Sequence, residues 1–478
     1  MTLPDFSPDA FARTLARVSE LAVAYLRALP QREAFRRPPD EVIRRFEAVP
    51  LPTEPTPAEA IVADMERDIL PYSLGIGHPR WWGYTRASPS PIGMAADLLA
   101  ATMNNNCSGS AQIATYVEMT VVRWLAELVA YGGDPGGILL SGGSAANFVA
   151  LAAMREAKLP GTRQRGLAGL ERAPVVYVTA ETHSCIRRAV DLLGFGSDAL
   201  RFLPTDADDR MDPAALAAAV RADRAAGHLP LCVVATAGTV NAGAIDPLTA
   251  IRDVARAEDL WFHVDGAYGA VGAAIPELAS QYQGMADADS LTVDPHKWLY
   301  VPYEAGCVLV RDRNALTRAF ATKADYLEVD ESDYFSGPLW FHQQGPQLSR
   351  AFRALKVWAV MRELGLDGFR ALWRQDLATA AALRRLVAAH PRLELVGPVT
   401  PLSIVCFRYV PRTGDPNRFN RTLVDRIQKD GRLFVAGTSV RGATCLRAAV
   451  LNFRSGPDDA RRAVEAVAEL GEALEHPP

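Results

Sequence analysis

The sequence predicts an α/β fold built on a mainly parallel sheet with helices on both faces. Between about residues 94 and 311, short apolar runs rich in β-branched residues alternate with helical stretches. Parallel strands that are buried on both faces have this continuous apolar character, and helices connect them. The predicted strands are 175–178, 231–235, 260–264, 290–293 and 307–310, with helices such as 213–227 and 247–258 between them.

The segment before the sheet, residues 1–90, predicts helices at 10–29 and 57–70 with a proline-rich break between them. These helices have little core of their own. We therefore expect this segment to pack on another domain or subunit.

The sheet domain is expected at residues 91–347, and it includes a long segment without clear periodicity, 323–345. A loop of this length inside a compact domain is commonly a functional lid. After it, residues 348–478 predict two helical runs and then a small α/β domain, which a helix at 457–474 closes.

Composition excludes several classes of protein. The chain has 478 residues and a formal net charge of −4, from 51 basic and 55 acidic side chains. This balance offers no electrostatic footprint for nucleic acid or for an anionic membrane surface. No apolar run is long enough for a transmembrane helix, and the N-terminus lacks the apolar core of a signal peptide. Six scattered cysteines indicate neither a zinc site nor a disulfide framework, so we expect a reduced, cytoplasmic protein without a metal.

Unusual polar residues follow the predicted strands. Ligands of open α/β sheets bind at the carboxyl ends of the strands, so these positions are informative. Lys297 is one of only five lysines in the chain. It follows a strand whose apolar sequence predicts burial, where an unpaired ammonium group would be costly. The other polar groups at strand ends or at a helix start are Gly142-Gly143-Ser144, His183, Thr236, Thr239, Asn241, Asp265 and His296.

Each group has a chemical use in one kind of site. Gly143 and Ser144 can bring backbone N–H groups to an anion at a helix N-terminus. A lysine can form a Schiff base with an aldehyde cofactor, and an aspartate can pair with a protonated pyridine nitrogen. An imidazole such as His183 can stack on an aromatic ring. Together these groups predict a pyridoxal 5'-phosphate (PLP) site. Taken singly, each group also has a purely structural interpretation. The glycines can form a tight strand-to-helix turn, Asp265 can cap a helix, and His183 can be a surface histidine.

Five segments of the sequence resemble the group II PLP-dependent amino acid decarboxylases. They are SGGSAANFVAL, GTVNAGAIDP, HVDGAYGA, SLTVDPHKWLY and GPQLSRAFRALKVW. The resemblance implies the type I fold of the aspartate aminotransferase superfamily and an intertwined homodimer with shared active sites. It also implies decarboxylation of an L-amino acid to the amine and CO₂.

Residue roles follow from the same resemblance. Lys297 would be the Schiff-base lysine, Asp265 the partner of the pyridine nitrogen, and His183 the stacking imidazole. Ala267 would lie against the opposite face of the ring. Gly143 and Ser144 would bind phosphate, with Thr239 and His296 close by.

The lid departs from the family pattern. Aligned on LSRAFRALKVW, Phe341 occupies the position of the tyrosine that is the presumed proton donor to Cα in family decarboxylases. Members with phenylalanine there resemble aldehyde synthases, in which an unprotonated intermediate reacts with O₂. Tyr334 or His342 can also supply the proton. We therefore expect a decarboxylase, with an aldehyde synthase that uses O₂ as the alternative.

The expected substrate pocket is aromatic in part. In HPRWWGY, Trp82 and Tyr84 are candidate pocket walls, which favours an aromatic amino acid. Thr85 and Arg86 replace the apolar pair that aromatic amino acid decarboxylases carry. A third alternative is another type I enzyme such as an aminotransferase, for which Arg447 would be a candidate carboxylate ligand.

Overall fold

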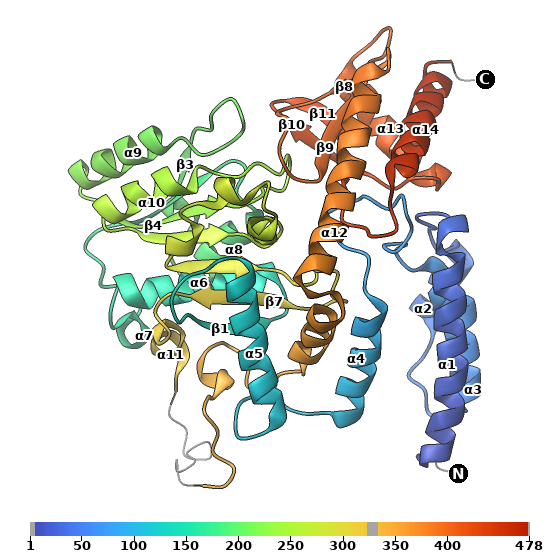
Figure 1. The fold of residues 1–478 in the computed structure, drawn as a ribbon, viewed down its shortest axis with the longest axis horizontal. Coiled ribbons are helices and arrows are strands. Elements are labelled where there is room, and N and C mark those ends of the chain that lie inside the picture. Colours follow the sequence, from blue (N-terminus) through green and yellow to red (C-terminus); the bar gives the residue numbers. More distant parts are fainter. Residues whose placement is uncertain (1–4, 323–332, 477–478) are drawn as a thin grey trace.

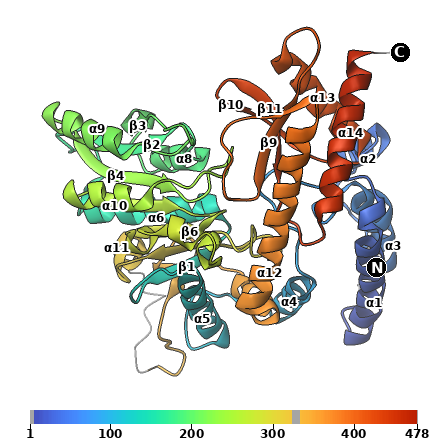
Figure 2. The ribbon, with the colours of Figure 1, turned by 45° about the horizontal axis from the view of Figure 1, so that its top comes forward.

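The computed structural model describes residues 5–322 and 333–476, which form two sheets joined by a long helix (Figure 1). The larger sheet has seven strands and the smaller has four. A group of N-terminal helices stands beside them at one end of the molecule in both views (Figures 1 and 2). Residues 323–332 of the expected lid lie outside the described residues, as do the ends of the expected N- and C-terminal segments.

The seven-stranded sheet is mainly parallel, as predicted. Its spatial order is β1-β7-β6-β5-β4-β2-β3, and only β7 runs against its two neighbours. The carboxyl ends of β4, β5 and β6 therefore meet at one edge, where the polar residues of the sequence gather. The strands are β1 (Gly136–Leu140), β2 (Pro174–Thr179), β3 (Leu200–Leu203), β4 (Leu229–Thr236), β5 (Trp261–Asp265), β6 (Ser290–Val293) and β7 (Gly306–Val310).

Helices cover both faces of this sheet, which explains why its strands are apolar along their whole length. One face packs on α6 (Gly143–Lys158), α8 (Ser184–Leu192) and α11 (Ala315–Phe320). The other face packs on α5 (Ile113–Leu128), α9 (Pro213–Ala225), α10 (Leu248–Ala257) and part of α12 (Arg353–Ala389). The short helix α7 (Thr162–Arg165) follows α6.

The smaller sheet has its own core and lies at the far end of α12 (Figure 1). The two predicted helical runs are both parts of α12, which bends at Gly365, where φ is +56°. The sheet is antiparallel in the order β10-β11-β9-β8. Its elements are β8 (Leu393–Leu395), β9 (Ile404–Tyr409), α13 (Pro416–Asp430), β10 (Ala436–Val440), β11 (Ala443–Ala449) and α14 (Pro457–Glu475).

The N-terminal helices bury little of their surface. In α1 (Pro8–Ala28) no residue is buried, and Phe11, Val18 and Val23 are exposed. The next helices are α2 (Asp40–Ala48), α3 (Ala58–Asp64) and α4 (Pro91–Met103), and α4 packs on α12. None of the helices within the described residues has the length and apolar character needed to cross a membrane.

Candidate active site

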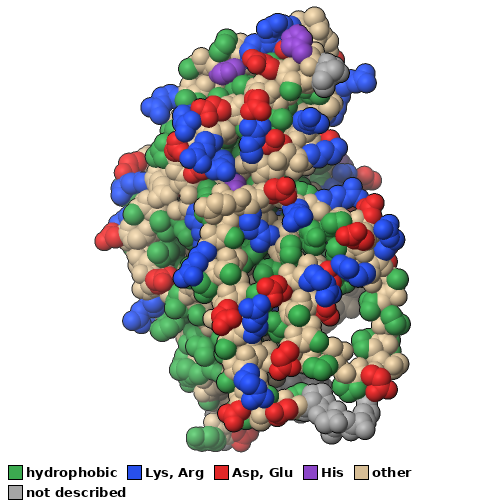
Figure 3. All heavy atoms as spheres, turned by 90° about the vertical axis from the view of Figure 1, so that its right-hand side faces the viewer, with side chains coloured by type: hydrophobic (Ala, Val, Ile, Leu, Met, Phe, Trp, Pro, Cys, Tyr) green, Lys and Arg blue, Asp and Glu red, His purple; other side chains and the backbone are tan. Residues whose placement is uncertain are grey.

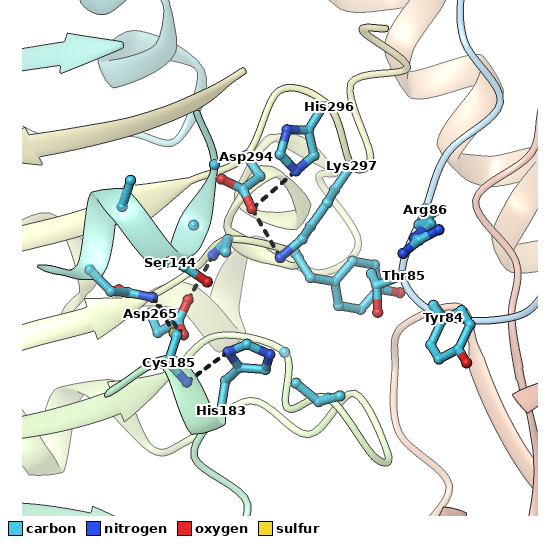
Figure 4. A pocket seen from close by; sticks show the side chains of 18 of the residues that line it. Tyr84, Thr85, Arg86, Ser144, His183, Cys185, Asp265, Asp294, His296 and Lys297 are labelled. Atoms are coloured by element: carbon cyan, nitrogen blue, oxygen red, sulfur yellow. Dashed lines mark hydrogen bonds and ion pairs between the residues drawn. The ribbon is translucent and has the colours of Figure 1, made fainter. Parts of the chain in front are cut away.

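A pocket of about 430 Å³ opens at the carboxyl ends of β4, β5 and β6 (Figure 4). The N-terminus of α6 closes one side of it. The segment 84–86 and Arg447 of β11 line the pocket from the smaller domain. This pocket thus lies between the two sheets, at the edge where the sequence predicts a ligand.

Two glycines make room at the start of α6. A Cβ atom on Gly142, where φ is +154°, would lie 2.8 Å from His296 Cε1. One on Gly143 would lie 2.7 Å from Asp294 Oδ2. No side chain caps this helix, so the N–H groups of its first turn are free to face an anion in the pocket, beside Ser144. The arrangement is a phosphate cradle built from backbone.

Lys297 lies in the loop after β6, and its Nζ reaches into the pocket 3.0 Å from Asp294 Oδ2 (Figure 4). Burial alone would lower the pKa of Lys297, but Asp294 and Asp265 outweigh it and raise the pKa above its usual value. The second oxygen of Asp294, Oδ1, is buried without a hydrogen-bond partner. Lys297 is therefore held charged beside a carboxylate.

Asp265 ends β5 and is almost fully buried. Its Oδ1 accepts a hydrogen bond from the Ala267 backbone over 3.1 Å, and its Oδ2 accepts one from Asn147 Nδ2 over 3.1 Å. Asn147 Oδ1 lies 2.7 Å from His263 Nε2 and accepts from Thr292 over 2.8 Å. These bonds hold the carboxylate in one orientation at the pocket floor.

His183 is the N-cap residue of α8, and its Nδ1 accepts a hydrogen bond from the Cys185 backbone over 3.2 Å. Burial lowers the pKa of His183 below its usual value, although the negative charge of Asp265 acts in the opposite direction. Ala267 lines the same pocket. Figure 4 shows the His183 ring facing the cavity below Lys297. A neutral imidazole is thus presented to whatever fills the pocket.

His296 braces the cradle. Its Nδ1 accepts a hydrogen bond from the Ala305 backbone over 3.0 Å, and its Nε2 lies 3.5 Å from Asp294 Oδ2. The ring of Tyr303 packs on it with centroids 4.5 Å apart. Burial lowers the pKa of His296. The neutral ring fits a position beside Gly142.

Three residues predicted for the site lie elsewhere. Trp82 is fully buried in the core of the smaller sheet, where its Nε1 donates to Ser455, so its prediction as a pocket wall is wrong. Thr239 does not line the pocket. Its hydroxyl accepts from the Ala244 backbone and braces the turn after β4. Phe341 is fully buried next to α11, and Arg350 packs over its ring at 4.8 Å. Phe341 therefore does not line the pocket of its own chain.

The remaining predicted residues divide between the pocket and the surface. Tyr84 lines the pocket mouth with φ at +58°. Tyr334 is fully exposed and does not line the pocket of its own chain. Asn147 was not among the predicted residues, although a polar residue on an apolar stretch of α6 is a weak signal of a role in the site. The further lining residues Cys185, Tyr303 and Glu304 were not predicted either.

The pocket fits PLP on its own evidence. The glycine cradle admits an anion where a side chain would collide. Lys297 supplies an amine in the same pocket, and the fixed carboxylate of Asp265 ends a neighbouring strand. An amine, a carboxylate and an anion cradle in one pocket of this fold define a PLP-dependent enzyme.

Comparison with known proteins narrows this class. The model of the pyridoxal-dependent decarboxylase conserved domain matches residues 39–410. The chain belongs to this family, and it is a PLP-dependent amino acid decarboxylase. The aromatic-L-amino-acid decarboxylase of Bacillus atrophaeus is 30% identical over 95% of this chain and 94% of its own length. The L-2,4-diaminobutyrate decarboxylase of Rhizobium meliloti is 34% identical over 89% of this chain and 84% of its own length.

Solved structures confirm the type I fold expected from the sequence. The crystal structure of Oryza sativa TDC with PLP and tryptamine matches with a TM-score of 0.91 and 30% sequence identity. The match covers 99% of this chain and all of that chain.

Proposed function

We propose that this decarboxylase holds PLP on Lys297 and removes the α-carboxyl group of an L-amino acid as CO₂. The proposal rests on one observation: Lys297 and Asp265 lie in a single pocket beside the anion cradle at the start of α6. The amine, the carboxylate and the cradle match the aldehyde, the ring nitrogen and the phosphate of PLP.

Each part of the cofactor has a partner in this proposal. When bound, PLP supplies an electron sink for the pair of electrons that the departing CO₂ leaves on Cα. The negative charge of Asp265 would keep the ring nitrogen protonated, and Asn147 and the Ala267 backbone already fix the orientation of its carboxylate. In this proposal Gly143 and Ser144 contact the phosphate, with His296 nearby. His183 and Ala267 lie against the two faces of the ring.

Lys297 is positioned by Asp294. Lys297 must be neutral to bond to the cofactor, and its pKa is raised. Asp294 Oδ2, 3.0 Å from Nζ, would hold this amine in place beside the cofactor aldehyde. Once the substrate amine replaces Lys297, the released Nζ is again available as a base.

The surroundings of Arg447 favour decarboxylation over amino transfer. An aminotransferase would use such an arginine to bind the α-carboxylate. Here Arg447 Nη2 donates to Thr85 Oγ1 over 3.0 Å and Nε donates to the Asn241 backbone over 3.3 Å. With its Nε–H edge held by the protein, Arg447 is less able to bind an α-carboxylate through two parallel hydrogen bonds, as an aminotransferase would.

Tyr334 is our proposed proton donor to Cα. The oxidative alternative depends on Phe341 at the lid tyrosine position, but Phe341 is fully buried and does not line the pocket of its own chain, which supports direct decarboxylation. Tyr334 lies on the lid side of the chain with its side chain fully exposed. In a homodimer with shared active sites, this exposed phenol would enter the pocket of the second subunit and protonate Cα, without O₂ as a co-substrate.

A homodimer would cover the apolar surface that this chain leaves exposed. Figure 3 shows hydrophobic side chains among charged ones on the face that carries the N-terminal helices. The exposed apolar residues of α1, α4 and α5 include Phe11, Val18, Val23, Leu98, Leu99, Ile113 and Tyr116. Surfaces of this kind mark subunit interfaces.

We propose that the protein works in the cytoplasm. Its six cysteines are all free, as is usual in a reducing compartment.

The proposal is tested by incubating the purified holoenzyme with each of the twenty amino acids while CO₂, ammonia and peroxide are measured together. We expect CO₂ without stoichiometric ammonia or peroxide. Sodium borohydride followed by peptide mass spectrometry should fix the cofactor to Lys297. Lys297→Ala should abolish both the label and CO₂ release, whereas Lys158→Ala, which removes a lysine paired with Asp259 at the surface, should change neither. A label on another lysine would contradict the proposal.

A further inference from the structure

Two arginines line the pocket on the side away from the phosphate cradle (Figure 4). Arg86 lies beside Thr85 and Tyr84, beyond Lys297 as seen from Ser144. Arg447 lines the pocket from β11. Substrate atoms beyond Cα must extend toward this side, because the cradle and Asp265 occupy the other.

The positive charge of these arginines is not balanced within the described residues. Neither has a carboxylate oxygen within 4.0 Å. Elsewhere in the pocket Asp294 pairs with Lys297 at 3.0 Å and Glu304 pairs with Arg353 at 2.8 Å, while Asp265, which no cation among the described residues pairs, is hydrogen-bonded to Asn147 near the cradle. The substrate end of the pocket therefore carries net positive charge.

The backbone that carries Arg86 is held firmly. Trp82 N donates to Phe434 O over 2.8 Å, and Ala449 N donates to Trp82 O over 2.9 Å. Further along, Ser88 N donates to Leu451 O over 3.2 Å. The buried indole of Trp82 anchors the segment in the smaller domain. Arg86 is thus presented from a fixed backbone beside the pocket.

Two contacts orient Arg86, and neither places an acidic group against its guanidinium. Its guanidinium lies 5.3 Å from the ring centroid of Tyr84, a cation–π contact. Arg447 binds the neighbouring Thr85 hydroxyl and holds that end of the segment. A guanidinium stacked on a ring keeps its N–H edge free, and that edge matches the two oxygens of a carboxylate.

We propose that the substrate is an L-amino acid whose side chain ends in an anionic group, a carboxylate or a sulfinate, which Arg86 binds. Arg447 is a positioning residue in this assignment. The inference rests on the proposed function, since it places the amine and the α-carboxyl group at Lys297. A cationic side chain would be repelled by both arginines, and an aromatic one would partly desolvate Arg86 without a counter-charge.

The first experiment compares kcat/KM of the holoenzyme for L-aspartate, L-glutamate and L-cysteine sulfinate with that for L-tryptophan, L-tyrosine and L-phenylalanine. We expect an acidic substrate to lead by about 30-fold or more. Arg86→Gln should reduce kcat/KM for it by a similar factor, mainly through KM, and Arg86→Lys should restore part of the loss. Arg461→Gln, at an exposed ion pair on α14, should have no effect.

The second experiment measures binding without turnover. Succinate and glutarate should raise the thermal midpoint of the holoenzyme and compete with substrate, and Arg86→Gln should abolish both effects while the absorbance of the bound cofactor is unchanged. Release of CO₂ from aromatic amino acids alone, or unchanged dicarboxylate binding by Arg86→Gln, would overturn the inference and leave the proposed function standing. Release of CO₂ from no amino acid would overturn both.

Discussion

Asn147 Nδ2 donates a hydrogen bond to Asp265 Oδ2 over 3.1 Å and thereby joins the first turns of α6 to the end of β5. Behind this contact, His263 Nε2 lies 2.7 Å from Asn147 Oδ1, and Trp261 Nε1 and His263 Nδ1 both lie 2.8 Å from Ser290 Oγ. Burial lowers the pKa of His263 to about 4, so this ring is neutral near pH 7. A neutral ring with Nε2–H donating to Asn147 Oδ1 leaves the amide N–H₂ facing Asp265.

Asn147→Leu should therefore weaken cofactor binding and kcat together by about 10-fold to 100-fold, the value of a hydrogen bond to a charged group. Cofactor affinity can be followed by its absorbance and kcat by CO₂ release. Thr292→Val is the matched control. It removes only one of the two donors to Asn147 Oδ1, so its effect should be much smaller. Equal effects of the two variants would show that the orientation of the amide does not matter.

Phe341→Tyr should leave the products unchanged, because this ring is buried next to α11 and does not line the pocket. The added hydroxyl has to be buried, and we expect it to lower the free energy of unfolding by about 1–3 kcal/mol. Tyr334→Phe, by contrast, should lower amine formation by about 10²-fold or more with little change in stability. Denaturant unfolding and product analysis separate the two. A change from aldehyde to amine on Phe341→Tyr would revive the oxidative alternative.

The buried ion pair of Arg350 and Glu118 offers a stability test. Arg350 Nη2 lies 2.5 Å from Glu118 Oε1 and also donates to the Leu139 backbone over 2.8 Å. Arg350→Met leaves a buried carboxylate without its partner, so we expect a loss of about 3–5 kcal/mol in the free energy of unfolding. The double variant Arg350→Met/Glu118→Leu should be more stable than Arg350→Met. A less stable double variant would mean that the pair itself contributes most of the stability.

The acid side of the stability profile should depend on His78. This fully buried ring has its pKa lowered to about 4 by burial and by Arg80. Between pH 6.5 and 4 the unfolded state therefore binds a proton that the folded state does not. Stability from this residue is complete above pH 6.5 and falls by at most about 1.4 kcal/mol per pH unit on acidification.

His78→Asn keeps an acceptor for the Arg80 backbone N–H, which donates to His78 Nδ1 over 3.1 Å, but it cannot titrate. Its unfolding free energy should fall less steeply between pH 6.5 and 4 than that of the unmodified protein. Urea unfolding at a series of pH values measures the two slopes. Parallel slopes would contradict the assignment of a buried neutral ring.

Much of the candidate site was predictable because its residues mark the ends of elements. Asp265 ends β5, Lys297 lies in the loop after β6, and Gly143 begins α6, so topology alone brings them to one edge of the sheet. Asn147 was not predictable in this way. It lies inside α6, and only the packing of that helix on β5 and β6 gives its amide a carboxylate to bind.

The positions of the aromatic side chains could not be predicted from the sequence alone. Trp82 and Phe341 lie near family motifs that predict a pocket wall and a lid residue, yet both side chains are fully buried. A large apolar ring gains free energy wherever it leaves water, so its residue type does not say which cavity it fills. Arg86 shows the reverse, because its type indicates a solvated surface and the fold places it beside the pocket.

The sequence by itself determined the fold class and the cofactor and predicted the lysine, since alternating strands and helices and strand-end residues are local patterns that the chain carries in order. Only the tertiary structure decided which side chains meet across the pocket. The unbalanced charge of Arg86 and Arg447 and the bond between Asn147 and Asp265 join segments that are distant in the chain. Such contacts depend on how the two sheets and α6 pack together, and packing is a property of the whole molecule.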